Sequence, residues 1–375
     1  MGDLTWLIEA MSSYGDRAAV VWEDRAITYA ELIGAIGRWD GHLDEAGIGA
    51  GSVVAIVGDY HPEAIGGLLA LIDRTCIVVP LTDVTAPQHD EFLEICGAEH
   101  IIRFGTDRDW TIEPTGGSTE PPLVTDLTEL GHPGLVVFSS GSTGKSKGML
   151  HDLNRTLEKF TVRRDPLVTL NFLLFDHFGG FNTLLHTISN GGTVVAASRR
   201  DPDSVCALIE QYEVELLPVS PTFVNLMILS QSHRRYDLSS LRLLTYGTEM
   251  MPQATLDRAR AALPDVEFRQ TYGLSETGVL RAKSRDDGSL WLKVGGEGIE
   301  TKVVDGTLRV RSRWAIVGYL NADDPFDEDG WIDTQDRVEV DGDYIRFLGR
   351  ETDIINVGGN KVYPAEVENV LLEHE

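Results

Sequence analysis

The chain has 375 residues, of which 59 are acidic and 32 basic, so its formal net charge is −27 at pH 7. A surface of this charge repels nucleic acid and anionic membranes, which argues against both as partners. Hydrophobic residues make up 42% of the chain, so we expect a soluble globular protein of about two or three subdomains.

The three cysteines, Cys76, Cys96 and Cys206, show neither a CxxC pair nor the spacing of metal ligands. They predict reduced thiols in the core of a cytoplasmic protein. The first residues lack the basic stretch that begins a signal peptide, and no apolar run approaches the roughly 20 residues that cross a bilayer. We therefore expect no membrane span.

The N-terminal region alternates strands and helices. Residues 19–30 predict a hairpin with an acidic turn. Thr28, followed three residues later by Glu31, forms a capping box that predicts the start of a helix. Strands predicted at 53–57 and 77–79 flank a further helix. This alternation indicates an α/β sheet.

Residues 105–122 are rich in Gly, Thr, Pro and acid, which predicts a loop. A short apolar strand at 135–138 then runs into ten residues made only of Ser, Gly, Thr and Lys, SSGSTGKSKG. Glycines let backbone N–H groups turn inward, hydroxyls add donors and lysines add positive charge. A flexible linker would need neither the strand nor the lysines, so the pattern favours a loop that wraps a polyphosphate.

The tripeptide Gly144-Lys145-Ser146 imitates the end of a Walker A motif. Ser139, however, stands where that motif has its first glycine. A Walker lysine also opens a helix, whereas Gly148 would lie in the first turn here, at a cost of about 1 kcal/mol. We regard the match as accidental, and a P-loop NTPase is only the third hypothesis for function.

The middle of the chain continues the α/β pattern. An apolar run as long as 167–175 is typical of a buried strand. The turn-rich pattern that begins at Trp291 instead predicts short strands in a small β-barrel or hairpin subdomain. The other elements predicted here are helices at 153–160 and 203–212 and strands at 194–197, 214–219, 241–246 and 268–271.

Several stretches together resemble the motifs of the adenylate-forming superfamily, which includes acyl- and aryl-CoA ligases, luciferases and nonribosomal peptide adenylation domains. The loop is similar to the family's phosphate loop, in which the last lysine before the final glycine contacts phosphate. The other stretches, in family order, are FDHFGG at 175–180, GTE at 247–249, TYGLSET at 271–277, GWIDTQD at 330–336 and a glycine-containing segment at 349–368.

The resemblance makes Lys147 the phosphate lysine, with Ser146 in place of the usual proline. It also makes His177 the family histidine beside the acyl pocket, and the extra Asp176 before it departs from the pattern. The hydroxyls of Ser139, Ser142 and Thr143 would hold the β- and γ-phosphates together with the lysine. Ser140, Gly141 and Gly144 would complete this nucleotide-binding loop.

Two further stretches resemble the adenosine side of the family's site. Gly247, Thr248 and Glu249 are similar to a loop whose backbone lines adenine. Asp336, at the end of GWIDTQD, would accept both ribose hydroxyls. Gln335 stands where the family has glycine, so the backbone there has less freedom.

The stretch TYGLSET resembles a motif that meets the base, the α-phosphate and the metal. The face of Tyr272 can stack on adenine, and the hydroxyl of Ser275 can bond the α-phosphate. Glu276 can hold Mg²⁺, which needs oxygen ligands. Thr271 and Gly273 would complete the nucleotide-binding surface.

The last stretch resembles the family's hinge and glycine loop. Arg350 would contact ribose or phosphate as a fixed fork of donors and act in catalysis. Thr352 stands at the hinge position, where the family has Asp or Lys, and Asp353 lies beside it. Gly358 and Gly359 would line a thiol tunnel.

The resemblance implies the large N-terminal domain of the adenylate-forming fold: two stacked α/β sheet subdomains and a small β-barrel subdomain. This AMP-binding domain would span 1–349, with its parts at about 1–165, 166–290 and 291–348, and 350–375 would be the hinge and the start of a C-terminal domain. In the family that domain is a lid with a catalytic lysine, for which no residue here aligns. We therefore expect this C-terminally short chain to bind ATP or acyl-AMP but to adenylate slowly.

The implied reaction is ATP-dependent activation of a carboxylic acid, preferably one without an amino group, to acyl-AMP. Pyrophosphate leaves, Mg²⁺ assists, and the acyl group passes to a thiol, with CoA preferred to an acyl-carrier protein. The second hypothesis is a nucleotide- or acyl-adenylate-binding protein with little ligase activity, degenerate or completed by a partner or further domain. The identity of the acid and the choice between monomer and homodimer stay open.

Overall fold

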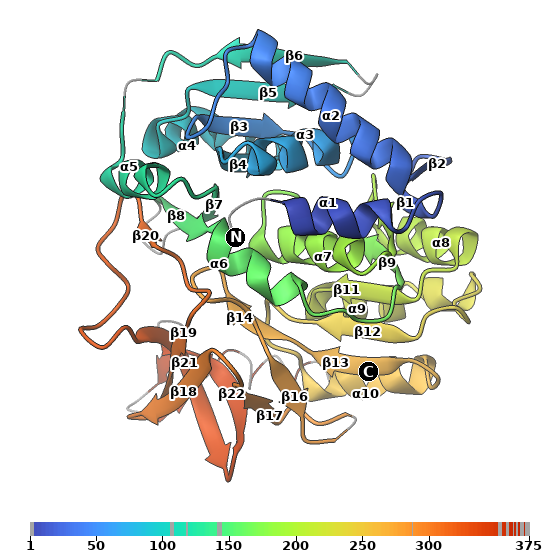
Figure 1. The fold of residues 1–375 in the computed structure, drawn as a ribbon. Coiled ribbons are helices and arrows are strands. Elements are labelled where there is room, and N and C mark those ends of the chain that lie inside the picture. The colour runs from blue at the N-terminus through green and yellow to red at the C-terminus, as the bar shows by residue number, and fades with distance from the viewer. Residues whose placement is uncertain are drawn as a thin grey trace. The chain divides into compact units, whose positions relative to one another are not determined.

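The computed structural model describes residues 4–105, 109–117, 119–140, 145–286, 288–351, 355–357, 360–362, 364, 367 and 371, and Figure 1 shows its ribbon. The chain forms two compact units. Unit 1 is made of Met1–Ser198 and Trp314–Asp324, and unit 2 of Arg199–Arg313 and Pro325–Glu375. The three-part division expected from the sequence stays a prediction.

The described part of unit 1 has both helices and strands. Its helices are α1 (Thr5–Ser12), α2 (Tyr29–Glu45), α3 (Pro62–Asp73), the 3-10 helix η1 (Asp83–Gln88), α4 (His89–Cys96), α5 (Pro122–Glu129), α6 (Leu153–Leu157), the 3-10 helix η2 (Glu158–Phe160) and α7 (Phe178–Ser189). Its strands are β1 (Ala18–Trp22), β2 (Arg25–Thr28), β3 (Val53–Val57), β4 (Ile77–Leu81), β5 (His100–Phe104), β6 (Trp110–Pro114), β7 (Gly134–Ser140), β8 (Ser146–Asp152), β9 (Val168–Asn171), β10 (Thr193–Ala196) and β20 (Gly318–Tyr319).

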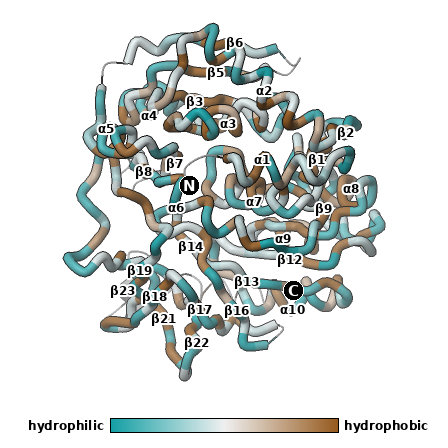
Figure 2. The backbone as a smooth tube through the Cα atoms, viewed as in Figure 1, coloured by the Kyte–Doolittle hydropathy of each residue, from teal (hydrophilic) through white to brown (hydrophobic). Residues whose placement is uncertain are grey.

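One sheet of unit 1 has seven strands in the order β20-β8-β7-β4-β3-β5-β6. Its central strands β7, β4, β3 and β5 run parallel, and antiparallel strands close both edges. β3 and β4 contain only buried residues, as expected for strands covered on both faces. Figure 2 shows the hydrophobic character of β3 and α3 in brown. The predicted α/β sheet is confirmed.

The second group of strands in unit 1 has the order β9-β10-β1-β2. β9, β10 and β1 are parallel, and β1 and β2 form the predicted hairpin. The predicted capping box then starts α2. The hydroxyl of Thr28 accepts the N–H of Glu31 at 3.1 Å, and the carboxylate of Glu31 accepts the N–H of Thr28 at 2.8 Å.

Two predictions for unit 1 are wrong. The supposed loop at 105–122 contains β6, which pairs along all of β5. Trp110 anchors this edge strand because its ring packs 4.9 Å from that of Trp39. The supposed long strand at 167–175 is only the four residues of β9, since the N–H of Phe172 turns back to the carbonyl of Leu170 at 3.0 Å.

The described part of unit 2 has the helices α8 (Pro202–Tyr212), α9 (Pro221–Leu229), the 3-10 helix η3 (Ser232–Arg234) and α10 (Gln253–Ala262). Its strands are β11 (Leu216–Val219), β12 (Leu243–Tyr246), β13 (Glu267–Gln270), β14 (Tyr272–Leu274), β15 (Gly278–Leu280), β16 (Ala282–Ser284), β17 (Leu292–Val294), β18 (Ile299–Val304), β19 (Thr307–Ser312), β21 (Ile332–Asp341), β22 (Tyr344–Arg350), β23 (Ile355–Val357) and β24 (Asn360–Val362).

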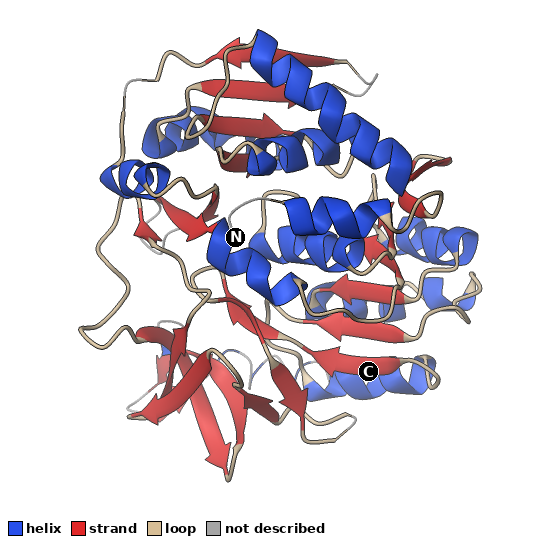
Figure 3. Cartoon of the chain, in the orientation of Figure 1, coloured by secondary structure: helices blue, strands red, loops and turns tan. Residues whose placement is uncertain are grey.

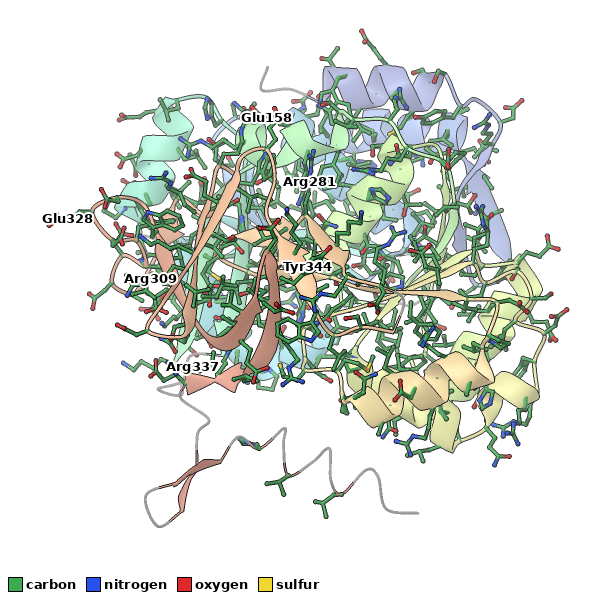
Figure 4. All side chains as sticks on the ribbon, turned by 90° about the horizontal axis from the view of Figure 1, so that it is seen from below. Glu158, Arg281, Arg309, Glu328, Arg337 and Tyr344 are labelled. Atoms are coloured by element: carbon green, nitrogen blue, oxygen red, sulfur yellow. The ribbon has the colours of Figure 1, made fainter. Side chains whose placement is uncertain are left out.

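Unit 2 combines a parallel and an antiparallel sheet. β11, β12 and β13 are parallel neighbours. A six-stranded antiparallel sheet has the order β16-β17-β22-β21-β19-β18, and Figure 3 shows its strands in red. Strands of this sheet carry charged side chains, among them Arg309 of β19 and Arg337 of β21, which Figure 4 labels. The guanidinium of Arg309 lies 3.6 Å from the carboxylate of Asp333. The predicted β subdomain is confirmed as a sheet of short antiparallel strands.

The three cysteines form no disulfide and are buried, as predicted. Burial raises the pKa of each thiol to about 12, so the thiols stay protonated at neutral pH. No helix within the described ranges is long and apolar enough to cross a membrane.

Candidate functional site

The carboxyl ends of three parallel strands adjoin one cavity in unit 2. Val219, Tyr246 and Gln270 end β11, β12 and β13 in register, and ligands of parallel α/β sheets bind beyond such ends. The cavity has a volume of about 760 Å³. Its lining includes Pro221, Thr222, Asn225, Thr248, Glu249, Thr255, Gln270, Thr271, Tyr272, Gly273, Asp336, Phe347, Gly349 and Arg350.

Asp336 is the polar centre of one wall of this cavity. The hydroxyl of Tyr272 donates to Oδ2 of Asp336 at 2.7 Å, and Nε of Arg350 lies 3.5 Å from Oδ1. The pairing of β21 with β22 places Asp336 opposite Arg350. The ring of Tyr272 stacks on that of Phe347, with centroids 4.4 Å apart and planes at 26°. Residues predicted from three separate motifs therefore meet at one carboxylate.

Burial perturbs the titration of both Asp336 and Tyr272 on this wall. Burial raises the pKa of Asp336, the nearby charge of Glu276 adds to this rise, and Tyr272 and Arg350 oppose it. Burial also raises the pKa of Tyr272 well above its usual range, so its hydroxyl stays a hydrogen-bond donor. Perturbed pKa values of this kind gather at functional sites.

A second wall is the predicted adenine-side loop after β12. Oε2 of Glu249 accepts the N–H of Thr222 at 3.1 Å and its hydroxyl at 2.5 Å, which places a carboxylate at the N-terminus of α9. Thr248 has a φ of 69°, a strained value for a β-branched residue. A Cβ at Gly247 would lie 2.4 Å from the hydroxyl oxygen of Thr271. Only glycine fits there.

Ser275 and Glu276 lie at the turn between β14 and β15, and both are half-buried. The carboxylate of Glu276 is near enough to raise the pKa of Asp336. Within the described ranges, no three His, Cys, Asp or Glu side chains gather as a metal cluster. Mg²⁺ at a nucleotide site commonly uses one or two carboxylates together with phosphate oxygens, so a single residue such as Glu276 fits that role.

The predicted phosphate loop joins β7 to β8 in unit 1. These strands are antiparallel, and Ser139 is the partner of Lys147. A Walker lysine begins a helix, whereas Lys145 here precedes a strand, so the fold argues against a P-loop NTPase. Lys147 is half-buried, and its Nζ lies 4.8 Å from the ring centroid of Tyr319. The predicted loop residues Gly141, Ser142, Thr143 and Gly144, and the side chain of Ser140, lie outside what the structure describes.

His177 precedes α7 in unit 1 and makes no side-chain capping bond to it. Its side chain is 60% exposed, and Nε2 lies 3.9 Å from Oδ1 of Asp176. Asp176 is buried, and its Oδ2 accepts the hydroxyls of Thr82 at 2.7 Å and Thr85 at 3.3 Å. The aspartate that departs from the family pattern therefore bonds to the start of the 3-10 helix η1.

Sequence reasoning missed several residues at these sites. Phe347 supports Tyr272, and Thr222 holds Glu249. Asn321 contacts the strand that carries Lys147, with Oδ1 accepting the N–H of Gly148 at 3.0 Å. None belongs to a quoted motif, and Asn321 lies two residues after the end of β20. The predicted hinge at Thr352 and the glycines at 358–359 lie outside the described residues.

Comparison with known proteins gives one consistent answer. A family model described as AMP-binding enzyme matches residues 7–320. A feruloyl-CoA synthase of Amycolatopsis sp is 30% identical over 98% of this chain and 82% of its own length. An indoleacetate–CoA ligase of Aromatoleum aromaticum is 28% identical over 95% of this chain and 80% of its own length.

Solved structures agree on the fold. The anthranilate CoA ligase AuaEII in complex with anthranoyl-AMP has a TM-score of 0.81 at 21% identity, with 98% of this chain and 81% of that chain covered. The amide bond synthetase McbA from Marinactinospora thermotolerans has a TM-score of 0.75 at 22% identity, with 99% and 84% covered. The chain belongs to the AMP-binding enzyme family, the adenylate-forming ligases that include the acid–thiol (CoA) ligases and use ATP and CoA.

Proposed function

We propose that this protein activates a carboxylic acid to acyl-AMP at the expense of ATP, releases pyrophosphate, and transfers the acyl group to a thiol, with CoA preferred. The observation that carries the proposal is the meeting of Tyr272, Asp336 and Arg350 at one cavity wall. The half-buried carboxylate of Asp336 offers acceptors for ribose hydroxyls, and the guanidinium of Arg350 beside it offers donors to ribose or phosphate.

The roles of the other residues follow from their chemistry. Lys147, with the hydroxyl of Ser139, holds the β- and γ-phosphates. Gly247, Thr248 and Glu249 line the base. Glu276 carries Mg²⁺, which would neutralise phosphate charge, and His177 lies beside the acyl group.

The chain needs no nucleophile of its own, because the substrate carboxylate attacks the α-phosphate and pyrophosphate leaves. Catalysis is then positioning and charge neutralisation. Arg350 supplies fixed positive charge where negative charge develops. Losing one such preorganised donor typically costs about 2.7–4 kcal/mol of transition-state stabilisation.

The acid is best sought among aryl-substituted carboxylic acids without an amino group. The relatives act, by their names, on indoleacetate, ferulate and 2-succinylbenzoate. A relative from Streptomyces coeruleorubidus is named as a fatty acid–[acyl-carrier-protein] ligase, so a carrier-protein acceptor belongs in the same screen.

The test is ATP–pyrophosphate exchange with a panel of aryl and aliphatic acids, with the Arg350→Ala variant as a control. We expect exchange with one acid class, AMP rather than ADP as product, and a loss of about 10²–10³-fold in the variant. Nucleotide binding without exchange for any acid would favour the binding-protein hypothesis.

A further inference from the structure

The exit of the phosphate loop is held by a segment that lies far away in the sequence. β20 pairs antiparallel with β8, Gly318 opposite Leu150 and Tyr319 opposite Met149. The N–H of Val317 donates to the carbonyl of Leu150 at 2.7 Å. This segment, Val317 to Asn321, therefore forms the edge of the sheet directly beside the strand that begins at the loop.

Asn321 extends this contact to the residues on both sides of Lys147. Its Oδ1 accepts the N–H of Gly148 at 3.0 Å, and its Nδ2 donates to the carbonyl of Ser146 at 2.8 Å. The N–H of Leu320 also donates to the carbonyl of Gly148 at 2.8 Å. The peptide groups before and after the lysine are thereby fixed by one side chain.

Gly148 shows how closely the two segments pack. A Cβ at this position would lie 3.0 Å from Ile95 Cγ2, 3.1 Å from Phe138 Cε1 and 3.4 Å from Leu320 Cδ1. These distances leave little room for the backbone after the lysine to shift. The direction in which Lys147 leaves the strand is therefore set by packing as well as by hydrogen bonds.

The ring of Tyr319 contacts the side chain of Lys147 itself. Nζ of Lys147 lies 4.8 Å from the centroid of its ring, within the range of a cation–π contact. Within the part of the chain that the structure describes, Lys147 forms no ion pair with a carboxylate. A contact with a ring face orders the ammonium without neutralising its charge, so the charge stays available to an anion.

We propose that Asn321 and Tyr319 are positioning residues that hold Lys147 in place for the β- and γ-phosphates of ATP; this rests on the proposed function. A free lysine side chain loses rotamer entropy when it binds phosphate. Ordering it beforehand removes part of that loss and raises affinity for the ligand that it contacts. AMP lacks the β- and γ-phosphates and gains nothing from this order.

The test measures dissociation constants for Mg-ATP and for AMP by titration calorimetry on the full chain. The variants are Asn321→Ala, which removes both bonds, and Tyr319→Leu, which removes the ring. Tyr319→Phe keeps the ring, and Asp323→Ala changes an exposed residue two positions after Asn321. We expect Asn321→Ala and Tyr319→Leu to weaken Mg-ATP binding about 3- to 10-fold and leave AMP within about two-fold, while the two control variants match the wild type.

Each outcome decides between explanations. Equal losses for ATP and AMP would mean a general structural role and overturn the proposal. Tighter ATP binding by Tyr319→Leu would mean that the ring competes with phosphate for the lysine, which also overturns it. If Asn321→Ala fails to fold, the Mg-ATP affinities of Tyr319→Leu and Tyr319→Phe still test the proposal, and equal affinities would overturn it. A wild-type chain that binds neither nucleotide overturns the proposed function itself, whereas a wild type that binds both without the ATP-specific loss overturns only this inference.

Discussion

Asp336 combines two properties that oppose each other, burial of a carboxylate and exposure of its oxygens to a ligand cavity. Its side chain is 14% exposed, and burial raises its pKa. The folded protein therefore holds the proton more tightly than the unfolded chain. Stability is lost as pH rises from the unfolded pKa, near 3.9, through the raised folded pKa, and the loss persists at neutral pH.

Replacing Asp336 by Asn should separate stability from binding. The amide keeps an acceptor for the Tyr272 hydroxyl but cannot ionise, so the apparent unfolding temperature relative to wild type should rise as pH increases through the acidic range. AMP affinity should fall about 10- to 100-fold, because a hydrogen bond to a charged group contributes about 1.5–3 kcal/mol. Glu328→Gln, which removes one charge at an exposed position, is the matched control. A variant that loses stability at pH 7 would contradict this account.

Gln335 shows how a departure from a family pattern can be accommodated. The sequence predicts a less free backbone at this position, and the structure gives a φ of 60°, in the region that glycine adopts freely and L-residues avoid. The N–H of Gln335 donates to the carboxylate of Asp333 at 2.9 Å, which helps to hold this conformation. This positive-φ conformation inside β21 is thus retained at the expense of local strain.

Changing Gln335 to Gly should relieve that strain. We expect a gain of up to about 1 kcal/mol in the free energy of unfolding, seen as a rise of about 1–2 °C in calorimetric unfolding temperature. Gln335→Ala, which removes the same side chain but keeps a Cβ, should show no gain. If Ala and Gly stabilise equally, the strain lies in the Gln side chain and not in the backbone.

At the scale of elements, the sequence predicts the helices and strands that local patterns determine, but not those that depend on contacts between distant residues. The capping box of Thr28 and Glu31 and the apolar run of β3 appear in the structure as the sequence predicts. β6 was missed because it lies in a stretch rich in Gly, Thr, Pro and acid, and because Trp110 is held by a tilted ring contact with Trp39, which is far away in the sequence. β9 was predicted too long, because an apolar run shows burial but does not show where the chain turns.

In the candidate site, too, single residues could be predicted from the sequence, whereas the contacts between them could not. Tyr272 and Asp336 could be predicted individually, since each belongs to a recognisable motif. Their hydrogen bond could not, because it joins elements 64 residues apart and leaves no pattern in either. Phe347 is one aromatic residue in an ordinary strand, and Asn321 is one amide after another strand. Their importance follows only from the partners that the fold brings to them.

At the scale of the whole molecule, composition leads to a prediction about stability. A net charge of −27 repels itself in any compact state. Described ion pairs such as Arg311 with Glu300 and Lys293 with Asp343 are exposed, and exposed pairs contribute little to stability because water and salt screen them. Salt weakens both effects, so the sign of its action on stability shows which one is larger.

We expect repulsion among acidic side chains to outweigh the attraction within ion pairs, because the chain has 59 acidic and only 32 basic residues. The unfolding temperature should rise when NaCl increases from about 10 to 150 mM, as the Debye length falls from about 30 Å to about 8 Å. KCl at equal ionic strength should act alike, which separates screening from ion-specific binding, and phosphate is avoided because the candidate loop would bind it. A fall in unfolding temperature would mean that surface ion pairs outweigh repulsion. In that case the attraction within local ion pairs on the folded surface would more than compensate for the repulsion among the excess acidic side chains.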